Sequence, residues 1–139
     1  MTPWTAEVRF PDGTVVRASS LAAREHNAGW RDHGLYLEHR WQPSWPARVV
    51  DWPDFGLPLD HVDAVDAIVD AYERASAGER VEVGCAGGLG RTGTVLACMV
   101  TLAGVGAHAA VDWVRRHYHV DAVETPDQER WVREFTRGY

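Results

Sequence analysis

A thiol and a guanidinium lie close together in a glycine-rich stretch of this 139-residue chain. Cys85 and Arg91 are separated by five residues, with a β-type apolar run over 80–83 before them and a helix-type run over 94–103 after them. Glycines allow successive backbone N–H groups to turn toward one point, and the start of the following helix adds positive charge. Such a loop favours an anion, which Arg91 can hold through paired hydrogen bonds, and it favours the nucleophilic thiolate of Cys85. The loop residues between them are Ala86, Gly87, Gly88, Leu89 and Gly90.

A second candidate for chemistry lies upstream, in the tryptophan- and proline-containing segment 52–56. By itself, Pro53 followed by Asp54 is typical of a surface turn, in which proline fixes φ and the aspartate hydrogen-bonds to its own backbone. Beside a thiolate and an anion site, Asp54 gains a second interpretation. Displacement of an alkoxide or phenolate from phosphorus requires a proton for the leaving oxygen, and Asp54 would supply it as a general acid. A carboxyl group is ordinarily ionised at neutral pH, so closure of the segment would have to retain the proton by desolvation.

Together, the two segments resemble the signatures of the cysteine-dependent protein tyrosine phosphatase superfamily. Cys85, five residues and then Arg91, Thr92 and Gly93 resemble its phosphate-binding loop, and the sequence Trp-Pro-Asp-Phe-Gly over 52–56 resembles its mobile acid loop. The resemblance implies a compact, dual-specificity-like phosphatase in which Cys85 takes up the phosphoryl group. Arg91 and the N–H groups of the loop would bind the phosphate oxygens, and Asp54 would be the general acid.

Two further residues match the family pattern. Thr92 resembles the hydroxyl residue that follows the signature arginine, whose family role is to hydrogen-bond to the thiolate and help it leave. Gln128 lies where the family carries a glutamine that positions the hydrolytic water. Thr92 is also a helix-start hydroxyl, and Gln128 also completes a local capping box with Thr125, so the structural interpretations stay open.

Gly84 is the main departure from the family pattern, because a histidine usually precedes the cysteine. That histidine helps to hold the loop and to favour the thiolate, so a glycine predicts a slower enzyme. The alternative that this departure leaves open is a pseudophosphatase that binds phosphate without efficient turnover. Cys85, Arg91 and Asp54 are all present, which favours the enzyme.

None of the five residues inside the loop is basic. Superfamily members that act on phosphoinositides often carry lysines there, so their absence favours a substrate with a single phosphate. We expect phosphotyrosine in a protein, with phosphoserine, phosphothreonine and small phosphate monoesters as further candidates. The expected partner is therefore a phosphorylated protein or a small phosphate ester, and no cofactor is implied.

Other ligand signatures fit less well. Gly88, Gly90 and Gly93 match the dinucleotide-binding fingerprint, but the acidic residue about 20 positions on, Asp112, falls in a helical pattern and too little chain follows it. A Walker loop requires a lysine where Arg91 stands. The seven histidines form no His-x-x-x-His pair and no cluster with cysteine, so we expect no bound metal.

Composition bounds the remaining possibilities. The length predicts one domain over residues 1–139. The net charge of −6 argues against nucleic acid and against anionic membrane surfaces as partners. No apolar run approaches the roughly 18 residues of a membrane span.

Residues 1–4 show no signal pattern and the two cysteines fit a reduced compartment, so we expect a cytoplasmic protein. Every basic side chain is arginine or histidine, which is typical of a GC-rich bacterium, and the oligomeric state stays open.

Periodicity predicts mixed strands and helices around the loop. Residues 7–10 and 14–17 should form a β-hairpin, and residues 35–37, 48–51 and 80–83 should form further strands. Helices are expected over 60–77, 94–103, 107–117 and from 126 onward, with Asp60 and Thr125 as N-caps. The strand–turn–helix unit implies an α/β fold. The family resemblance implies a central, twisted, largely parallel sheet flanked by helices.

Overall fold

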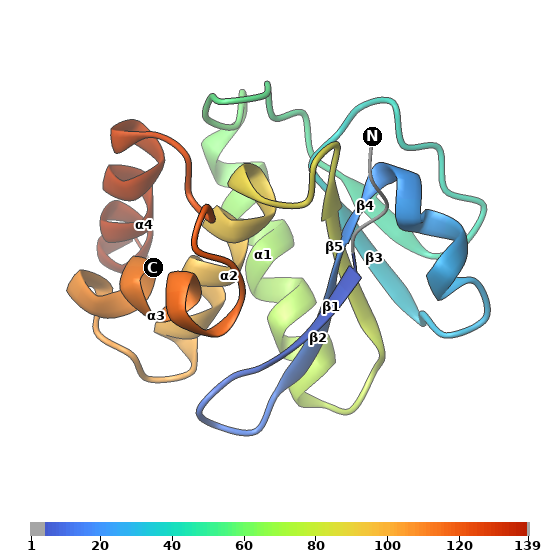
Figure 1. Ribbon diagram of the computed structural model, residues 1–139, viewed down its shortest axis with the longest axis horizontal. Helices are drawn as coiled ribbons and strands as arrows, with labels where there is room; N and C mark the ends of the chain where they lie inside the picture. Colours follow the sequence, from blue (N-terminus) through green and yellow to red (C-terminus); the bar gives the residue numbers. More distant parts are fainter. Residues whose placement is uncertain (1–4, 139) are drawn as a thin grey trace.

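Five strands form a single sheet in the computed structural model, which describes residues 5–138 (Figure 1). They are β1 (Thr5–Arg9), β2 (Val15–Ser20), β3 (His33–Tyr36), β4 (Ala47–Val49) and β5 (Val81–Cys85). Their order across the sheet is β1-β2-β5-β3-β4, with β1 antiparallel to β2 and every other pair parallel. The predicted α/β fold with a largely parallel sheet is therefore confirmed. Residues 1–4 and residue 139 lie outside the described residues. The prediction that the chain shows no signal pattern falls on residues 1–4.

The two faces of the sheet are covered differently (Figure 1). On one face α1 and α2 contact the strands, and α3 and α4 pack outward against α2. The other face carries the short 3₁₀ helix η1 (Leu21–Asn27), drawn in blue, which contacts β2 and β5. Helices therefore flank the sheet as predicted, but all the α-helices within residues 5–138 lie on one face. The α-helices are α1 (His61–Ser76), α2 (Gly90–Leu102), α3 (Ala107–His117) and α4 (Pro126–Gly138).

Strand β5 places the anion loop at the centre of the sheet. It runs between β2 and β3, with Ser20 opposite Cys85 and Tyr36 opposite Gly84. Every residue of β5 is buried, as expected for a parallel strand that is covered on both faces. Its carboxyl end therefore delivers Cys85 to the edge of the sheet at which ligands bind in open α/β folds.

Helix α2 begins at Gly90, earlier than the predicted start at residue 94. The end of the anion loop already forms the first helical turn, in which the Gly93 N–H donates to the Leu89 carbonyl at 2.7 Å. Apolar periodicity missed this turn because its residues are glycine, arginine and threonine. The first N–H groups of a helix have no intrahelical acceptor, so they remain available to an anion bound in the loop.

The segment that follows β4 prepares the acid loop. β4 covers Ala47–Val49, whereas the sequence predicted a strand over 48–51. Beyond the strand, the Asp51 carbonyl accepts the Leu59 N–H at 3.0 Å, which closes a loop between them. Asp54 therefore lies on a loop whose two ends are joined by a hydrogen bond, at the same end of the sheet as Cys85.

Asp60 caps helix α1 as predicted, since its Oδ1 accepts the Asp63 N–H at 3.0 Å. We predict that Asp60→Ala lowers the free energy of unfolding by about 1 kcal/mol, because alanine leaves that donor without its acceptor. Asp60→Asn retains an acceptor and should be nearly as stable as the wild type. Urea denaturation measures both variants, and an alanine variant as stable as the asparagine variant would contradict the cap.

Candidate active site

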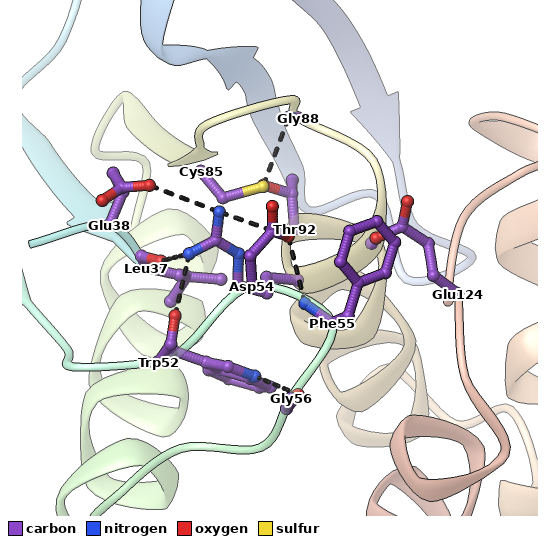
Figure 2. Close-up of polar contacts among 12 residues, drawn as sticks. Leu37, Glu38, Trp52, Asp54, Phe55, Gly56, Cys85, Gly88, Thr92 and Glu124 are labelled. Carbon is purple, nitrogen blue, oxygen red and sulfur yellow. Dashed lines mark hydrogen bonds and ion pairs between the residues drawn. The ribbon is translucent and has the colours of Figure 1, made fainter.

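Cys85 ends strand β5 with its sulfur enclosed by the loop that follows (Figure 2). The residue is only 2 % exposed. Its Sγ accepts hydrogen bonds from the Gly88 N–H at 3.2 Å and from the Thr92 hydroxyl at 3.0 Å. Gly88 has φ +78°, a left-handed conformation that glycine adopts without a Cβ clash. Two donors from the following loop and helix are therefore directed at one sulfur.

The loop itself is held from outside by two other segments. The Leu21 N–H, at the start of η1, donates to the Ala86 carbonyl at 3.2 Å. The Tyr118 hydroxyl, just after α3, donates to the Gly88 carbonyl. Because the carbonyls of Ala86 and Gly88 accept hydrogen bonds from groups outside the loop, the N–H groups of the loop can point inward, as that of Gly88 does. The five predicted loop residues, Ala86, Gly87, Gly88, Leu89 and Gly90, thus form one anchored turn between Cys85 and Arg91.

Arg91 is buried, with 2 % of the residue exposed. Its Nη1 donates to the carbonyls of Leu37 and Trp52, both at 2.8 Å. Its Nη2 lies 3.4 Å from Glu38 Oε2 and 3.6 Å from Asp54 Oδ1. Its Nε has no hydrogen-bond partner among the described residues. A buried N–H without an acceptor is costly, and Nε with Nη2 is the guanidinium edge that can bind two oxygens of a phosphate.

The acid loop 52–56 is a turn whose base is fixed by hydrogen bonds (Figure 2). Trp52 Nε1 donates to the Gly56 carbonyl at 2.7 Å, and the Gly56 N–H donates to the Pro53 carbonyl at 3.0 Å. At the tip, Phe55 is exposed and has φ +58°, which is unfavourable for a bulky side chain. The base of the loop is therefore rigid, and the tip that carries Asp54 holds the backbone strain.

Asp54 points from this tip toward the cysteine loop (Figure 2). Its Oδ1 accepts the Phe55 N–H at 3.1 Å and lies 3.6 Å from Arg91 Nη2. The side chain is 58 % exposed, so the desolvation expected on loop closure is incomplete in this arrangement. The structure thus brings Asp54, Arg91 and Cys85 to one site, as their order in the sequence predicted.

Glu38 is a site residue that the sequence did not reveal. Its carboxylate is buried and pairs with Arg40 at 3.0 Å as well as with Arg91. The hydrogen bond from the Arg40 side chain outweighs desolvation and, with the Arg40 N–H and the charge of Arg91, lowers the pKa of Glu38 to about 2. Glu38 therefore stays ionised and orients the guanidinium of Arg91. A cavity of about 200 Å³ lies here, lined by Glu38, His39, Arg40, Trp52, Pro53, Asp54 and Arg91.

Glu124 is a second carboxyl group that the sequence did not reveal (Figure 2). It lines a separate cavity with Phe55 and Leu89, and its carboxyl lies against Gly90, where any larger residue would collide with it. Burial and then the charge of Asp54 raise the pKa of Glu124. Glu124 therefore holds a proton to higher pH than an ordinary glutamic acid, beside the predicted general acid.

Gln128 is buried and links helix α4 to the acid loop. Its N–H donates to Thr125 Oγ1 at 3.1 Å, as predicted for the N-cap. Its side-chain oxygen accepts the Glu124 N–H at 2.8 Å, so the returning bond of the predicted capping box goes to Glu124 and not to Thr125. Its Nε2 donates to the Gly56 carbonyl at 3.1 Å. In this arrangement the fully buried Gln128 side chain tethers the acid loop to helix α4.

Residues 5–138 contain neither a metal-binding cluster nor a membrane-spanning helix. No group of three or more histidine, cysteine, aspartate or glutamate side chains in that part of the chain is arranged to hold a metal ion. No helix within the same residues is both long and apolar enough to cross a membrane.

Comparison with known proteins identifies the family. Residues 59–138, more than half of the chain, match the family PTP-SAK, "Swiss Army Knife protein, DSP-PTPase phosphatase domain". The chain is also 36 % identical over 115 residues to the uncharacterized protein MJECL20 of Methanocaldococcus jannaschii, a match that spans 74 % of this chain and 75 % of that protein. The chain therefore belongs to the DSP-PTPase phosphatase family, within the predicted superfamily. This relative is archaeal and gives no support to a bacterial origin.

Solved structures share the fold over almost the whole chain. Tk-PTP in its active form superposes with a TM-score of 0.77 and 25 % identity, covering 95 % of this chain and 97 % of that one. Kinase associated phosphatase, with its catalytic-site cysteine replaced by serine, gives a TM-score of 0.81 at 14 % identity, covering 99 % and 96 %. The human tyrosine-protein phosphatase non-receptor type 4 is 31 % identical over 99 residues, which span 67 % of this chain and 11 % of that protein.

The ion pairs of Glu38 predict a pH-dependent contribution to stability. Because folding lowers the pKa of Glu38 from an ordinary 4.5 to about 2, its contribution is present above the ordinary value and is lost as pH falls toward 2. We predict that Glu38→Gln lowers the free energy of unfolding by about 3 kcal/mol at neutral pH, since it leaves Arg91 poorly compensated. The difference from the wild type should shrink as the pH falls through this window.

Urea denaturation across a pH series measures this difference. Glu38→Asp retains a carboxylate and should retain part of the pH dependence. A loss of stability in Glu38→Gln that is the same at acidic and neutral pH would contradict the ion-pair interpretation.

Proposed function

We propose that this protein is a metal-independent phosphatase that hydrolyses phosphate monoesters through a cysteinyl-phosphate intermediate, with phosphotyrosine in proteins as its main substrate. The observation that carries the proposal is the buried, unpartnered Nε of Arg91, in the loop whose Cys85 sulfur already receives two hydrogen bonds. One loop thus combines a binding edge for an oxyanion with a stabilised nucleophile. Membership in the DSP-PTPase family supports the reaction class, and the catalytic-site cysteine of kinase associated phosphatase supports the role of Cys85.

In the first step, the Cys85 thiolate attacks phosphorus, so an S–P bond forms as the P–O bond to the leaving group breaks. The leaving oxygen takes the proton of the Asp54 carboxyl group. Loop N–H groups and the free edge of Arg91 bind the non-bridging oxygens, where charge develops in the transition state. Asp54 already lies beside Arg91, which supports its place at the leaving-group side.

In the second step, water attacks the phosphorus of the cysteinyl-phosphate, and the Asp54 carboxylate takes the proton of that water. The S–P bond breaks, inorganic phosphate is released and the thiolate is regenerated. The Thr92 hydroxyl, 3.0 Å from Cys85 Sγ, stabilises the departing thiolate. Gln128 would position the water once movement of the acid loop exposes its amide, which is fully buried beside the Gly56 carbonyl.

The substrate carries one phosphate in this proposal. The loop residues 86–90 are not basic, and Arg40 at the mouth is already paired with Glu38. Phe55 is 62 % exposed at the mouth and offers a face for the ring of phosphotyrosine. Phosphoserine, phosphothreonine and small phosphate monoesters are the further candidates. A cytoplasmic location stays a prediction.

The alternative function is a phosphate-binding pseudophosphatase, because Gly84 stands where the superfamily usually has a histidine. Such a protein would use the same Arg91 edge and the same loop, but without turnover. Kinetics and binding on the same variants separate the two functions.

Turnover of an aryl phosphate in the presence of a metal chelator is the direct test. We expect Cys85→Ser to lower kcat at least about 1000-fold, because the nucleophile is lost. Asp54→Asn should lower kcat about 100-fold and flatten the alkaline limb of the pH profile, because the leaving group then departs without a proton.

Glu124→Gln is the matched carboxyl variant for this assay. If Asp54 is the proton donor, Glu124→Gln should lower kcat by less than about threefold. A larger loss in Glu124→Gln than in Asp54→Asn would assign proton donation to Glu124. A wild type as inert as Cys85→Ser, with both binding a phosphotyrosine peptide, would establish the pseudophosphatase and reject the enzyme.

Thr92→Ala tests the cysteinyl-phosphate intermediate. It removes one hydrogen bond to the departing thiolate, so we expect the second step to slow by about 10- to 100-fold. Rapid-quench kinetics should then show a burst of phenol release followed by slow turnover, whereas Thr92→Ser should resemble the wild type. Turnover of Thr92→Ala at the wild-type rate and without a burst would contradict this role.

A further inference from the structure

Gly84 has no side chain because another residue occupies the space that a side chain would fill. A Cβ placed on Gly84 would lie 2.7 Å from Cη2 and 2.9 Å from Cζ3 of the Trp41 indole. Protein interiors are close-packed, and separations this short force one of the groups to move. The position at which the superfamily usually carries a histidine is therefore filled by a tryptophan from a different segment.

Trp41 is fixed from its other side by a second aromatic ring. It stacks on Tyr36, with ring centroids 4.3 Å apart and planes inclined by 12°. Tyr36 in turn covers Gly34, where a Cβ would collide with the Tyr36 ring. Two glycines of β3 and β5 thus make room for two stacked rings, both of which are buried.

The stack is held by Glu82, a fully buried residue of β5 that precedes Gly84 by two positions. Its carboxylate accepts hydrogen bonds from four side chains, so its position is tightly defined. Trp45 Nε1 adds a hydrogen bond to the Tyr36 hydroxyl at 2.7 Å. The four donors to Glu82 are the hydroxyl of Tyr36 at 2.5 Å, the hydroxyl of Ser19 and Nε of Arg31 at 2.9 Å each, and the amide of Asn27.

The segment that carries Trp41 also reaches Arg91. The Trp41 N–H donates to the Glu38 carbonyl at 3.0 Å, and the Leu37 N–H donates to the Gly84 carbonyl at 2.8 Å. The Leu37 carbonyl accepts from Arg91 Nη1, and the Glu38 carboxylate lies beside Nη2. Seating Trp41 on Gly84 therefore fixes the strand that carries Cys85 together with the groups that orient Arg91.

We propose that Trp41, seated on Gly84 and stacked on Tyr36, is the positioning residue of the phosphate-binding loop and supplies the support that a histidine before the cysteine would otherwise give. This inference rests on the proposed phosphatase function of the loop. Trp41 acts through Gly84 and through residues 37 and 38. Its contact keeps the loop donors directed at the Cys85 sulfur and keeps the free edge of Arg91 directed at the phosphate.

A double-mutant cycle between positions 41 and 84 tests this proposal. Gly84→Ala adds the methyl group that would meet Cη2 and Cζ3 of Trp41, and Trp41→Phe removes those two atoms. We expect Gly84→Ala alone to lower kcat about tenfold with KM changed less than about threefold, because the loop shifts relative to the bound phosphate. Trp41→Phe alone should also lower kcat, by about fivefold, because Gly84 loses the contact that positions its strand, and the double variant should recover most of either loss because the added methyl group fills the space left by those two atoms. Trp30→Phe is the control, since the Trp30 ring instead lies under Arg17.

Alkylation of Cys85 by iodoacetate across pH gives a readout that does not require turnover. Cys98 is fully buried, and burial raises the pKa of its thiol well above the ordinary value, so Cys85 is the thiol that reacts. Gly84→Ala should slow alkylation of Cys85 and weaken its protection by inorganic phosphate, each about tenfold. Trp41→Phe should restore both in the double variant.

The outcomes separate this proposal from the function on which it rests. If Gly84→Ala has the same effect with tryptophan as with phenylalanine at position 41, or no effect with either, the positioning role of Trp41 is overturned. If the wild type shows no turnover but the substitutions at positions 41 and 84 are coupled in alkylation rate and in phosphate protection, the phosphatase function fails and the positioning role stands.

Discussion

The buried guanidinium of Arg91 is the interaction on which the rest of the site depends. A charge enclosed in a protein interior costs several kcal/mol unless polar partners replace its water. Here the partners are the carbonyls of Leu37 and Trp52 and the carboxylate of Glu38. Leu37 follows β3 and Trp52 opens the acid loop, so one side chain joins three segments that are remote in the sequence. Because the two carbonyls saturate Nη1 and Nη2 lies beside Glu38, Nε is the nitrogen of Arg91 left without a hydrogen-bond partner among the described residues.

This arrangement requires the two faces of the sheet to be built differently. On the helical face, Val81 and Val83 of β5 are fully buried and contribute hydrophobic stabilisation. On the η1 face, β5 presents Glu82 and Gly84, which belong to a polar and aromatic network. Glu82 is fully satisfied by four donors, whereas the buried Nε1 of Trp41 has no hydrogen-bond partner among the described residues. The hydrophobic face therefore holds the sheet together, while the polar face defines where the loop that follows Cys85 lies.

The sequence alone predicted the features whose residues lie close together in the chain. Cys85 and Arg91 belong to one turn, and the Asp60 cap depends on a contact three residues away, so spacing alone located them. Glu38 and Trp41 reach the site from another segment, and in the sequence they resemble an ordinary acidic residue and an irregular loop. Gly84 shows the limit most clearly. A missing histidine indicated weakened chemistry, whereas the fold stacks Trp41 on Tyr36 of β3 and so places the Trp41 ring against the bare backbone of Gly84.

Three carboxyl groups lie near Arg91, and their environments differ. Glu38 is paired with two arginines, which hold its pKa near 2, so it cannot act as a proton donor at neutral pH. Glu124 lies in the opposite environment, where burial and the charge of Asp54 raise its pKa. Interaction between two carboxyl groups disfavours the doubly ionised state of the pair. The raised pKa therefore belongs to Glu124, whereas Asp54 is more than half exposed and lies 3.6 Å from Arg91 Nη2.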